Sequence, residues 1–486
     1  MSIAPPPSAR GAVRQAFFWN AANFGVNQLL SAVVFIVLSN RLDPVILGIF
    51  AFSLIFIDFW AVQAKSAATD AIVQRQDFSH STLSTLFWAH LSATCLIIGA
   101  LVALAPLLTS ALGHPEAADV MRALTLALIF TPILAVGEAI VMKDLGFRTL
   151  AIRNLFSVIF GGAAGIAVVF SPHAEWALVA QRVLGVGAAA LLIWASTRFV
   201  PALCFDRGLV RLYWRSFLAL WGAQSLGVAI SRIGDFLIGL RIGPGTLGIL
   251  QVARRFPDML QGPVTQPISM MWIPMLARIG NDEAERISFF KQLIGLAALV
   301  CLPTFMGLAL IAPELTRLVL NTNYTDQNIA MVVIVLCSIG LFSPIISHRS
   351  SVMVSRGKNR LNLILTLWDL AVSAITVFVF SQYGLVEVLI AWTIATAVLT
   401  TPPSVYFMLR AVGINFLEFL REIYPAYGAA IVMILTVLLA RLLLNSIGDF
   451  PRMLIMMLVG AATYTMWIWI FHRSWAQLRV RLLLRR

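Results

Sequence analysis

Charged residues are scarce in this chain. Only 12% of its 486 residues are Asp, Glu, Lys or Arg, whereas 60% are hydrophobic. Soluble domains carry about 25% charged residues, so this composition cannot coat a water-facing surface of the required size. Long apolar runs follow one another from residue 16 to residue 472. The composition therefore predicts a polytopic membrane protein rather than several soluble domains.

Cysteines and catalytic motifs are scarce as well. The four cysteines lie far apart, in or beside apolar runs, without the CxxC or Cys/His spacing of a metal site. The sequence contains no Walker motif, no cluster of metal ligands and no nucleophile elbow. We therefore expect neither ATP hydrolysis nor covalent catalysis, no bound cofactor, and a protein that is not an enzyme.

The apolar runs are long enough to cross about 30 Å of hydrocarbon as α-helices. The short alternating segments of a β-barrel are absent from the sequence. We predict an all-α polytopic membrane protein with about 14 transmembrane helices. Their expected ranges are 16–39, 45–66, 83–108, 118–142, 150–171, 175–198, 212–240, 246–276, 288–312, 327–354, 360–381, 384–411, 420–444 and 452–472.

Every second connection between the predicted transmembrane helices lies on the same side of the membrane. Lysine and arginine are concentrated in the connections of one side. By the positive-inside rule this set faces the cytoplasm, so both termini are predicted to be cytoplasmic and the number of spans even. The net charge of +13 then reports topology, and nucleic acid is not expected as a partner. The cytoplasmic set is taken to include Lys65, Arg153, Lys291 and Arg349, whereas the opposite set holds only Arg41, Arg122, Arg241, Arg317, Arg441 and Arg452.

Segments of the first half of the chain recur in the second half in the same order. This recurrence predicts two parallel six-helix repeats around a central cavity, a plan found in secondary transporters. The expected lobes are residues 1–207 and 208–412, and residues 413–486 add two helices and a basic cytoplasmic tail. The recurring pairs are Arg41–Phe50 with Arg241–Leu250, Ala105–Thr109 with Ala312–Thr316, Thr131–Ile133 with Ser343–Ile345, and Val141-Met142 with Val352-Met353.

Polar residues line one face of the predicted eighth helix. Ionisable side chains at membrane depth usually face a cavity or a charged partner, so we predict a hydrated central cavity beside this stripe. The alternative is that Arg254 with Asp258, and Arg232 with Asp235, form intrahelical ion pairs that hold helices together. The stripe recurs at spacings of three and four residues and comprises Gln251, Arg254, Asp258, Gln261 and Thr265, with Arg255 beside it.

Other predicted helices, mainly the first helices of each half of the chain, also carry polar or ionisable residues. Asp58 in the second helix occupies the repeat position of Asp258, so we expect these carboxylates to face each other across a pseudo-twofold axis. Glu138, Asp369 and His90 are solitary polar residues for which we expect a structural role. The further cavity candidates are Asn23 and Asn27 in the first helix, Arg182 in the sixth, and Gln224, Arg232 and Asp235 in the seventh.

Two stretches carry a resemblance to a known family. The segment from Leu42-Asp43-Pro44 to Phe50 resembles the N-terminal signature of the polysaccharide transport family, the Wzx-like flippases. The stretch from Arg254-Arg255-Phe256-Pro257-Asp258 to Trp272-Ile273-Pro274 resembles the eighth helix of that family. The likeness extends over nearly the whole chain. Multidrug and toxin extrusion transporters and lipid II flippases belong to the same superfamily.

The resemblance implies a flippase of the bacterial inner membrane. Its substrate would be an undecaprenyl-pyrophosphate-linked oligosaccharide for O-antigen, capsule or exopolysaccharide assembly, moved by alternating access with ion coupling. Polysaccharide polymerase and glycosyltransferases are the implied partners. In this scheme Arg182, Arg232, Arg254 and Arg255 bind the pyrophosphate, Asn23, Asn27, Gln224, Gln251 and Gln261 bind sugar hydroxyls, and Asp58, Asp235 and Asp258 carry a proton or sodium ion.

Three other functions make different demands on the sequence. A cation-coupled multidrug exporter of the same fold calls for an acidic, aromatic pocket, whereas this stripe is rich in arginine. A polysaccharide polymerase or ligase calls for a large outward loop, but the expected outward connections are short. A structural scaffold has no need of a buried polar stripe.

Overall fold

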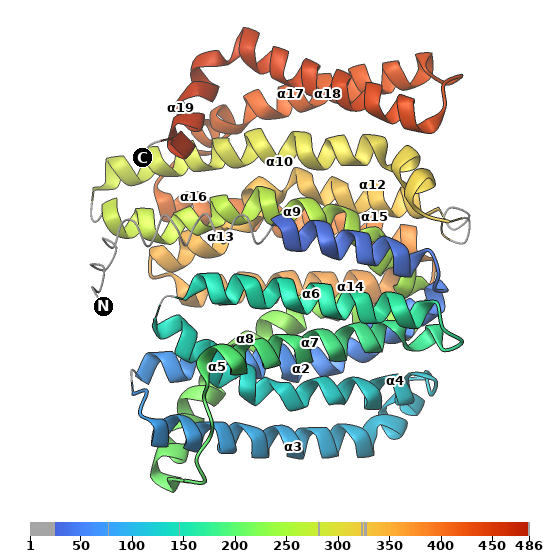
Figure 1. Ribbon diagram of the computed structural model, residues 1–486. Helices are drawn as coiled ribbons and strands as arrows, with labels where there is room; N and C mark the ends of the chain where they lie inside the picture. The colour runs from blue at the N-terminus through green and yellow to red at the C-terminus, as the bar shows by residue number, and fades with distance from the viewer. Residues whose placement is uncertain are drawn as a thin grey trace, which may run out of the picture. The chain divides into compact units, whose positions relative to one another are not determined.

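The computed structural model describes residues 25–75, 77–144, 146–279, 282–321, 324 and 328–484 (Figure 1). Within these ranges the secondary structure is helical and contains no strand. The chain divides into two compact units, Met1–Gly248 and Ile249–Arg486. The helix that opens the second predicted lobe packs with the first unit, so this unit extends beyond residue 207. The lobe boundaries drawn from the repeat remain predictions.

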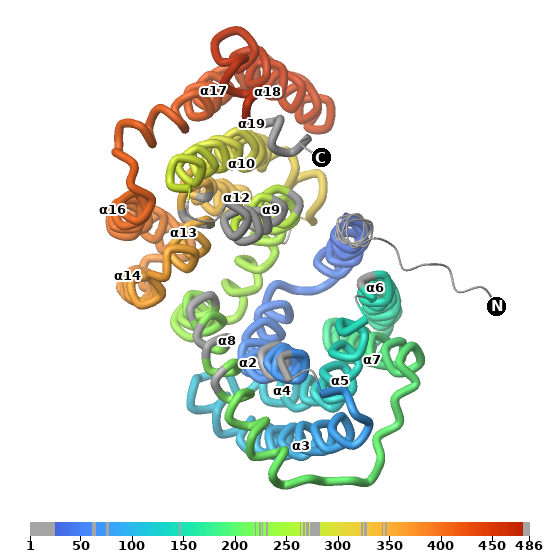
Figure 2. Tube along the Cα trace, turned by 90° about the vertical axis from the view of Figure 1, so that its left-hand side faces the viewer, coloured from blue at the N-terminus to red at the C-terminus, as the bar shows by residue number. Residues whose placement is uncertain are grey.

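The first unit begins with a helix over Gly25–Ser39. Helices α6 and α7 lie side by side in it (Figure 2), and α8 packs along α2. Its remaining helices are α2 (Pro44–Arg75), α3 (His80–Ala111), α4 (Ala117–Leu124), η1 (Thr125–Phe130), α5 (Thr131–Lys143), α6 (Phe147–Val169), η2 (Ala174–Trp176), α7 (Ala177–Thr197) and α8 (Arg207–Arg241).

The second unit contains most of α9 (Pro244–Ile279), whose first turn belongs to the first unit. Helices α17 and α18 lie side by side and both pack on α10 (Figures 1 and 2). The helices after α9 are α10 (Glu283–Val319), α12 (Ile329–Ser338), η3 (Ile339–Leu341), α13 (Ser343–Ser355), α14 (Asn359–Phe380), α15 (Leu385–Ala395), η4 (Thr396–Thr400), α16 (Thr401–Val412), α17 (Phe416–Leu443), α18 (Asp449–Phe471) and α19 (Arg473–Leu484).

Among the described residues, 10 helical segments are long and apolar enough to cross a membrane. Each of them overlaps a predicted span, which confirms an all-helical protein with many membrane spans. Two shorter apolar helices, Gly25–Ser39 and Ile329–Leu341, also overlap predicted spans. The full count of 14 helices remains a prediction.

A broken helix occurs at corresponding places in the two units. In the first unit the 3-10 helix η1 leads into α5, and in the second η3 leads toward α13. Pro132 and Pro344 stand in the first turn of α5 and α13. Proline is tolerated there because the first helical positions need no intrahelical N–H donor. The sequence repeat thus has a counterpart in local structure.

The recurring Pro-x-x-x-Gly segments meet at the start of α2 and α9. A Cβ atom added to Gly48 would lie 1.6 Å from the carbonyl oxygen of Pro244, and one added to Gly248 would lie 1.9 Å from that of Pro44. Only glycine permits backbones to cross this closely. The reciprocal contact relates the two segments by local pseudo-twofold symmetry.

Four basic residues assigned to cytoplasmic connections lie inside helices instead. Lys65 belongs to α2, Arg153 to α6, Lys291 to α10 and Arg349 to α13. Each is bonded to a carboxylate of a neighbouring helix, at Glu138, Glu418 or Asp369. These basic residues were placed in connections because they stand near the ends of apolar runs. From sequence alone, a basic residue at such a position that pairs within the protein cannot be distinguished from one that faces water.

Candidate functional site

An aromatic pocket of about 440 Å³ lies within the first unit. Its rings come from α2, which supplies Phe56, Phe59 and Trp60, and from α8, which supplies Trp221 and Phe236. Phe59 and Trp60 both contact Trp221, with ring centroids 5.8 and 5.6 Å apart. Because Phe56, Phe59 and Trp60 are spaced at three and four residues on α2, they share one face of that helix. We call this space, with Arg232 at its lining, the aromatic pocket.

Polar groups in the aromatic pocket are few and mainly hydrogen-bond donors. Arg232 is its charged lining residue and is 39% exposed in its side chain. The indole N–H groups of Trp60 and Trp221 are buried and have no acceptor among the described residues. A buried indole N–H normally finds an acceptor, so these donors are available to a ligand.

Arg232 also belongs to a set of charged side chains on neighbouring helices of the first unit. Arg182 of α7 donates to Asp58 of α2 over 2.6 Å. Arg232 lies 3.9 Å from Asp58 and donates to Asp235 over 3.3 Å. Asp235 is 1% exposed. The structure thus brings together four predicted site residues from three helices and confirms the intrahelical pair of Arg232 with Asp235.

Glu138 extends this set and is not the solitary residue that the sequence suggested. Its carboxylate accepts from Lys65 of α2 over 2.9 Å and from Arg153 of α6. The Glu138 side chain is only 8% exposed. Arg153 also donates to the side-chain oxygen of Asn154. The first-unit charge network therefore comprises Asp58, Lys65, Glu138, Arg153, Arg182, Arg232 and Asp235.

The second unit has a related pair with exchanged charges. The spacing that relates Val141 to Val352 also relates Glu138 to Arg349. Arg349 donates to Asp369 of α14 over 2.6 Å, to Ser404 over 2.8 Å and to Thr366 over 3.2 Å. In each unit a charged residue of the broken helix thus pairs with an opposite charge on the next helix.

The two other residues expected to be solitary differ from one another. Asp369 is paired with Arg349 as described above. His90 is 1% exposed, lies against the ring of Phe217 and has no hydrogen-bond partner among the described residues. A neutral imidazole within an apolar cluster fits the structural role expected for His90.

Predicted site residues of α9 lie in the second unit. Gln251, Arg254 and Arg255 are half-buried, whereas Asp258 and Gln261 are exposed. The expected approach of Asp58 to Asp258 joins two different units and stays a prediction. Asn27 is half-buried in the first described helix. Asn23 and the side chain of Gln224 lie outside the described residues.

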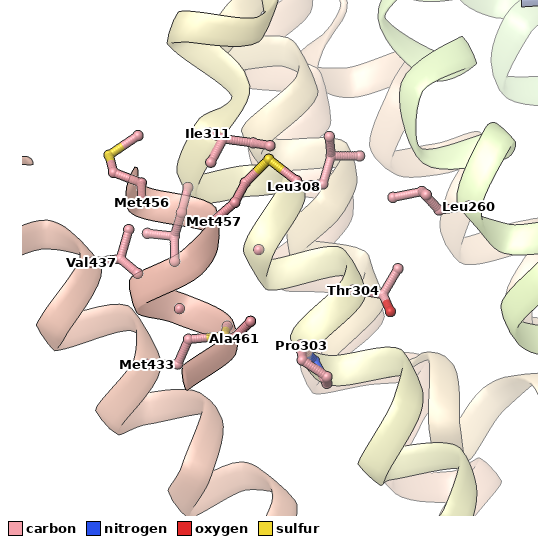
Figure 3. A pocket seen from close by; sticks show the side chains of 13 residues that line it. Leu260, Pro303, Thr304, Leu308, Ile311, Met433, Val437, Met456, Met457 and Ala461 are labelled. Atoms are coloured by element: carbon pink, nitrogen blue, oxygen red, sulfur yellow. The ribbon is translucent and has the colours of Figure 1, made fainter. Parts of the chain in front are cut away.

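A second pocket, of about 400 Å³, lies between α9, α10, α17 and α18 in the second unit (Figure 3). Met433, Met456 and Met457 line it together with small and branched apolar side chains. Its hydroxyl group at Thr304 donates to the Val300 carbonyl oxygen of its own helix. This pocket has no charged lining residue and therefore offers no charge for an anionic headgroup.

Two features were missed by sequence reasoning although weak signs were present. Phe56, Phe59 and Trp60 have helical spacing, but such aromatic stripes usually form cores. Glu138 and Arg153 stand at similar distances before and after the turn at Gly146. Two helices that reverse at a short turn can bring such residues together, but the packing of the helices decides whether they meet.

The sequence comparisons give relatives that are named for polysaccharide biosynthesis. A family model described as "Polysaccharide biosynthesis protein" matches residues 23–329. The chain is 23% identical over 350 residues to the lipopolysaccharide biosynthesis protein WzxC of Escherichia coli, covering 70% of this chain and 69% of that protein. It is 22% identical to the succinoglycan biosynthesis transport protein ExoT of Rhizobium meliloti, covering 90% and 89%.

Structural comparisons agree on the fold. The lipid II flippase MurJ, in an inward closed conformation, superposes with a TM-score of 0.71 at 17% identity, covering 94% of this chain and 99% of that one. A multidrug resistance MATE family transporter of the MOP superfamily, in an inward-facing conformation, superposes with a TM-score of 0.63 at 16% identity, covering 79% and 94%. The helical architecture is therefore that of MurJ and MATE transporters.

Proposed function

The chain belongs to the polysaccharide biosynthesis protein family, and from this premise we propose that it is a flippase for a lipid-linked anionic oligosaccharide. The substrate would be an undecaprenyl-pyrophosphate-linked oligosaccharide that passes from the cytoplasmic to the outer leaflet of the bacterial inner membrane. The product would supply O-antigen, capsule or exopolysaccharide assembly. Relatives named for lipopolysaccharide and succinoglycan biosynthesis support this substrate class.

The observation that carries the proposal is the aromatic pocket with Arg232 at its lining. Flat aromatic rings pack against the apolar faces of sugar rings, and the free indole N–H groups of Trp60 and Trp221 suit sugar hydroxyls. A guanidinium group matches phosphate oxygens bidentately. Arg232 and Arg182 are therefore assigned to the pyrophosphate, together with Arg254 and Arg255 of α9.

Ion coupling is assigned to the carboxylates of the charge network. Asp58 is bonded to Arg182 in this structure. When substrate phosphate takes Arg182 and Arg232, Asp58 loses both basic neighbours and becomes able to take up a proton or sodium ion. Asp235 and Asp258 are the further coupling candidates. Outward movement of an anion also gains about 2.3 kcal/mol per charge per 100 mV from an inside-negative potential.

The proposed architecture completes this scheme. Fourteen spans would form two parallel six-helix lobes, 1–207 and 208–412, with two added helices in 413–486 and cytoplasmic termini. Rocking of the lobes would expose the site alternately to each side. Asn23, Asn27, Gln224, Gln251 and Gln261 would bind sugar hydroxyls. The protein would act without a cofactor and without catalysis, and would supply a polysaccharide polymerase with products of glycosyltransferases.

A multidrug exporter of the same fold is less well supported. Cationic drugs require an unpaired carboxylate in an aromatic pocket. Here Asp58, Glu138 and Asp369 are each bonded to a basic side chain, and the charged group of the aromatic pocket is Arg232. The electrostatics of the described pockets therefore favour an anionic substrate.

Export in cells tests the proposal directly. A strain lacking the gene is complemented with the wild type, Arg232→Ala, Trp221→Ala or the exposed-pair control Arg122→Ala. Loss of a charged hydrogen bond of about 1.5–3 kcal/mol predicts roughly 10- to 100-fold slower export by Arg232→Ala. Lipid-linked oligosaccharide should accumulate in the membrane with both site variants and not with the control. Wild-type export by Arg232→Ala and Trp221→Ala together would remove the aromatic pocket from the transport path.

A further inference from the structure

A second cavity of the first unit, of about 190 Å³, lies between α2, α5, α6 and α7. We call it the charged cavity. Three basic side chains, Lys65, Arg153 and Arg182, line it, and the other lining groups are neutral. A sugar-bearing headgroup is too large for this space, so the charged cavity differs in kind from the aromatic pocket.

Positive charge around the cavity exceeds negative charge. Lys65 and Arg153 share one carboxylate, Glu138, and Arg182 is bonded to Asp58. Three basic groups therefore face two acidic groups, while Arg232 and Asp235 extend the network by one charge of each sign. An unbalanced charge in a low-dielectric interior is costly. A bound anion would remove that imbalance.

Hydrogen-bond donors remain available around the cavity. The Nε–H groups of Arg153 and Arg182 are buried and have no acceptor among the described residues. The lining also contains the side chains of Asn154 and Ser157, which can donate. Positive charge and unused donors on three helices are the elements of an anion site.

The second unit provides an internal contrast. Arg349 and Asp369 form a balanced pair, with the remaining guanidinium donors directed to Ser404 and Thr366. The repeat spacing that relates Asp58 to Asp258 relates Lys65 to Thr265, which carries no charge. At this place in the repeat the extra cation is therefore found in the first unit, although at the far end of α10 Arg317, Arg441 and Arg452 likewise surround the two carboxylates Glu314 and Asp449.

We propose that the charged cavity binds one small monovalent inorganic anion of the chloride class, held by Lys65, Arg153 and Arg182. The anion neutralises the network and stabilises the packing of α2, α5, α6 and α7. It is a resident ion and not the transported substrate, and Arg182 is the one residue that this site shares with the proposed pyrophosphate site.

Thermal unfolding of the purified full-length protein in detergent tests this site. Chloride replaces gluconate at constant ionic strength, so that screening stays fixed. A ligand that binds only the folded state raises the apparent Tm with ln(1 + [L]/Kd), and bromide should act like chloride. Arg153→Gln and Arg182→Gln should weaken this dependence at least tenfold in half-saturating concentration. Arg349→Gln is the matched control and should retain the wild-type chloride dependence.

Lys65→Met separates anion binding from a merely structural role of the network. It makes the three-to-two charge count equal, so the variant should lose the chloride dependence and be at least as stable in gluconate as the wild type. An apparent Tm of the wild type that is identical in chloride and gluconate would overturn the proposal. Equal loss of chloride dependence in Arg349→Gln, retention of it in Lys65→Met, or preference for inorganic pyrophosphate over chloride would also overturn it. Export assays are independent of these readouts.

Discussion

Single residues decide the polarity of the site in the first unit. Glu138 accepts from two basic side chains on two other helices while it is almost fully buried. Arg182 and Asp58 pair from helices that are far apart in the chain. Removal of either carboxylate, Glu138 or Asp58, leaves basic side chains without their partner. The network therefore attaches α2, α5, α6, α7 and α8 to one another through charged contacts.

We expect Glu138→Gln to destabilise the first unit. It leaves Lys65 and Arg153 without their carboxylate, and breaking a buried pair from one side costs about 3–5 kcal/mol. The apparent Tm in detergent measures the effect. The control Glu175→Gln changes an exposed carboxylate near His173, and surface pairs are worth about 0–1 kcal/mol. Equal Tm values for the two variants would contradict a supporting role of Glu138.

Polar contacts add fixed points to the apolar packing of the helices in the second unit. The α17–α18 hairpin is attached to α10 near both ends, by Lys291 with Glu418 and by Glu314 with Arg441. Between these pairs Tyr464 donates to the Leu299 carbonyl oxygen over 3.0 Å. At the start of α2 and α9, by contrast, close backbone contact at Gly48 and Gly248 takes the place of side chains.

We expect Gly48→Ala to separate α2 from the start of α9. The new methyl group would meet the Pro244 carbonyl oxygen, and overpacking of this kind typically costs about 1–3 kcal/mol. Gly99→Ala is the matched control, since no atom lies within 4 Å of an added Cβ there. Replacing glycine by alanine in such a helix should be neutral or slightly stabilising. A Gly48→Ala variant as stable as Gly99→Ala would show that the crossing relaxes freely.

At the scale of the whole molecule, the long apolar helices and the predicted repeat together predict how the chain is threaded through the membrane. Ten described segments can cross a membrane, and the broken helices α4–η1–α5 and α12–η3–α13 occupy corresponding places in the two units. Six spans in each predicted repeat would give both copies the same orientation. The connections on either side of a given helix should then face opposite sides of the membrane.

Thiol labelling of intact cells measures this orientation. In a background without other cysteines, Gly113→Cys reports the connection between α3 and α4, and native Cys204 reports the connection between α7 and α8. A membrane-impermeant maleimide should label position 113 in intact spheroplasts and Cys204 only after permeabilisation. Labelling of Cys204 from outside would reverse the predicted cytoplasmic termini.

The sequence alone determined the membrane environment, the helical class and the family, because apolar length, charge placement and repeated segments are local properties of the chain. It also identified Asp58, Arg182, Arg232 and Asp235, since ionisable groups inside apolar runs are conspicuous. Only the tertiary structure decided which charges pair, because Glu138 meets Lys65 and Arg153 through helix packing. It likewise decided that the rings of Phe59, Trp60 and Trp221 line a pocket, since helical spacing describes a face but not what that face encloses.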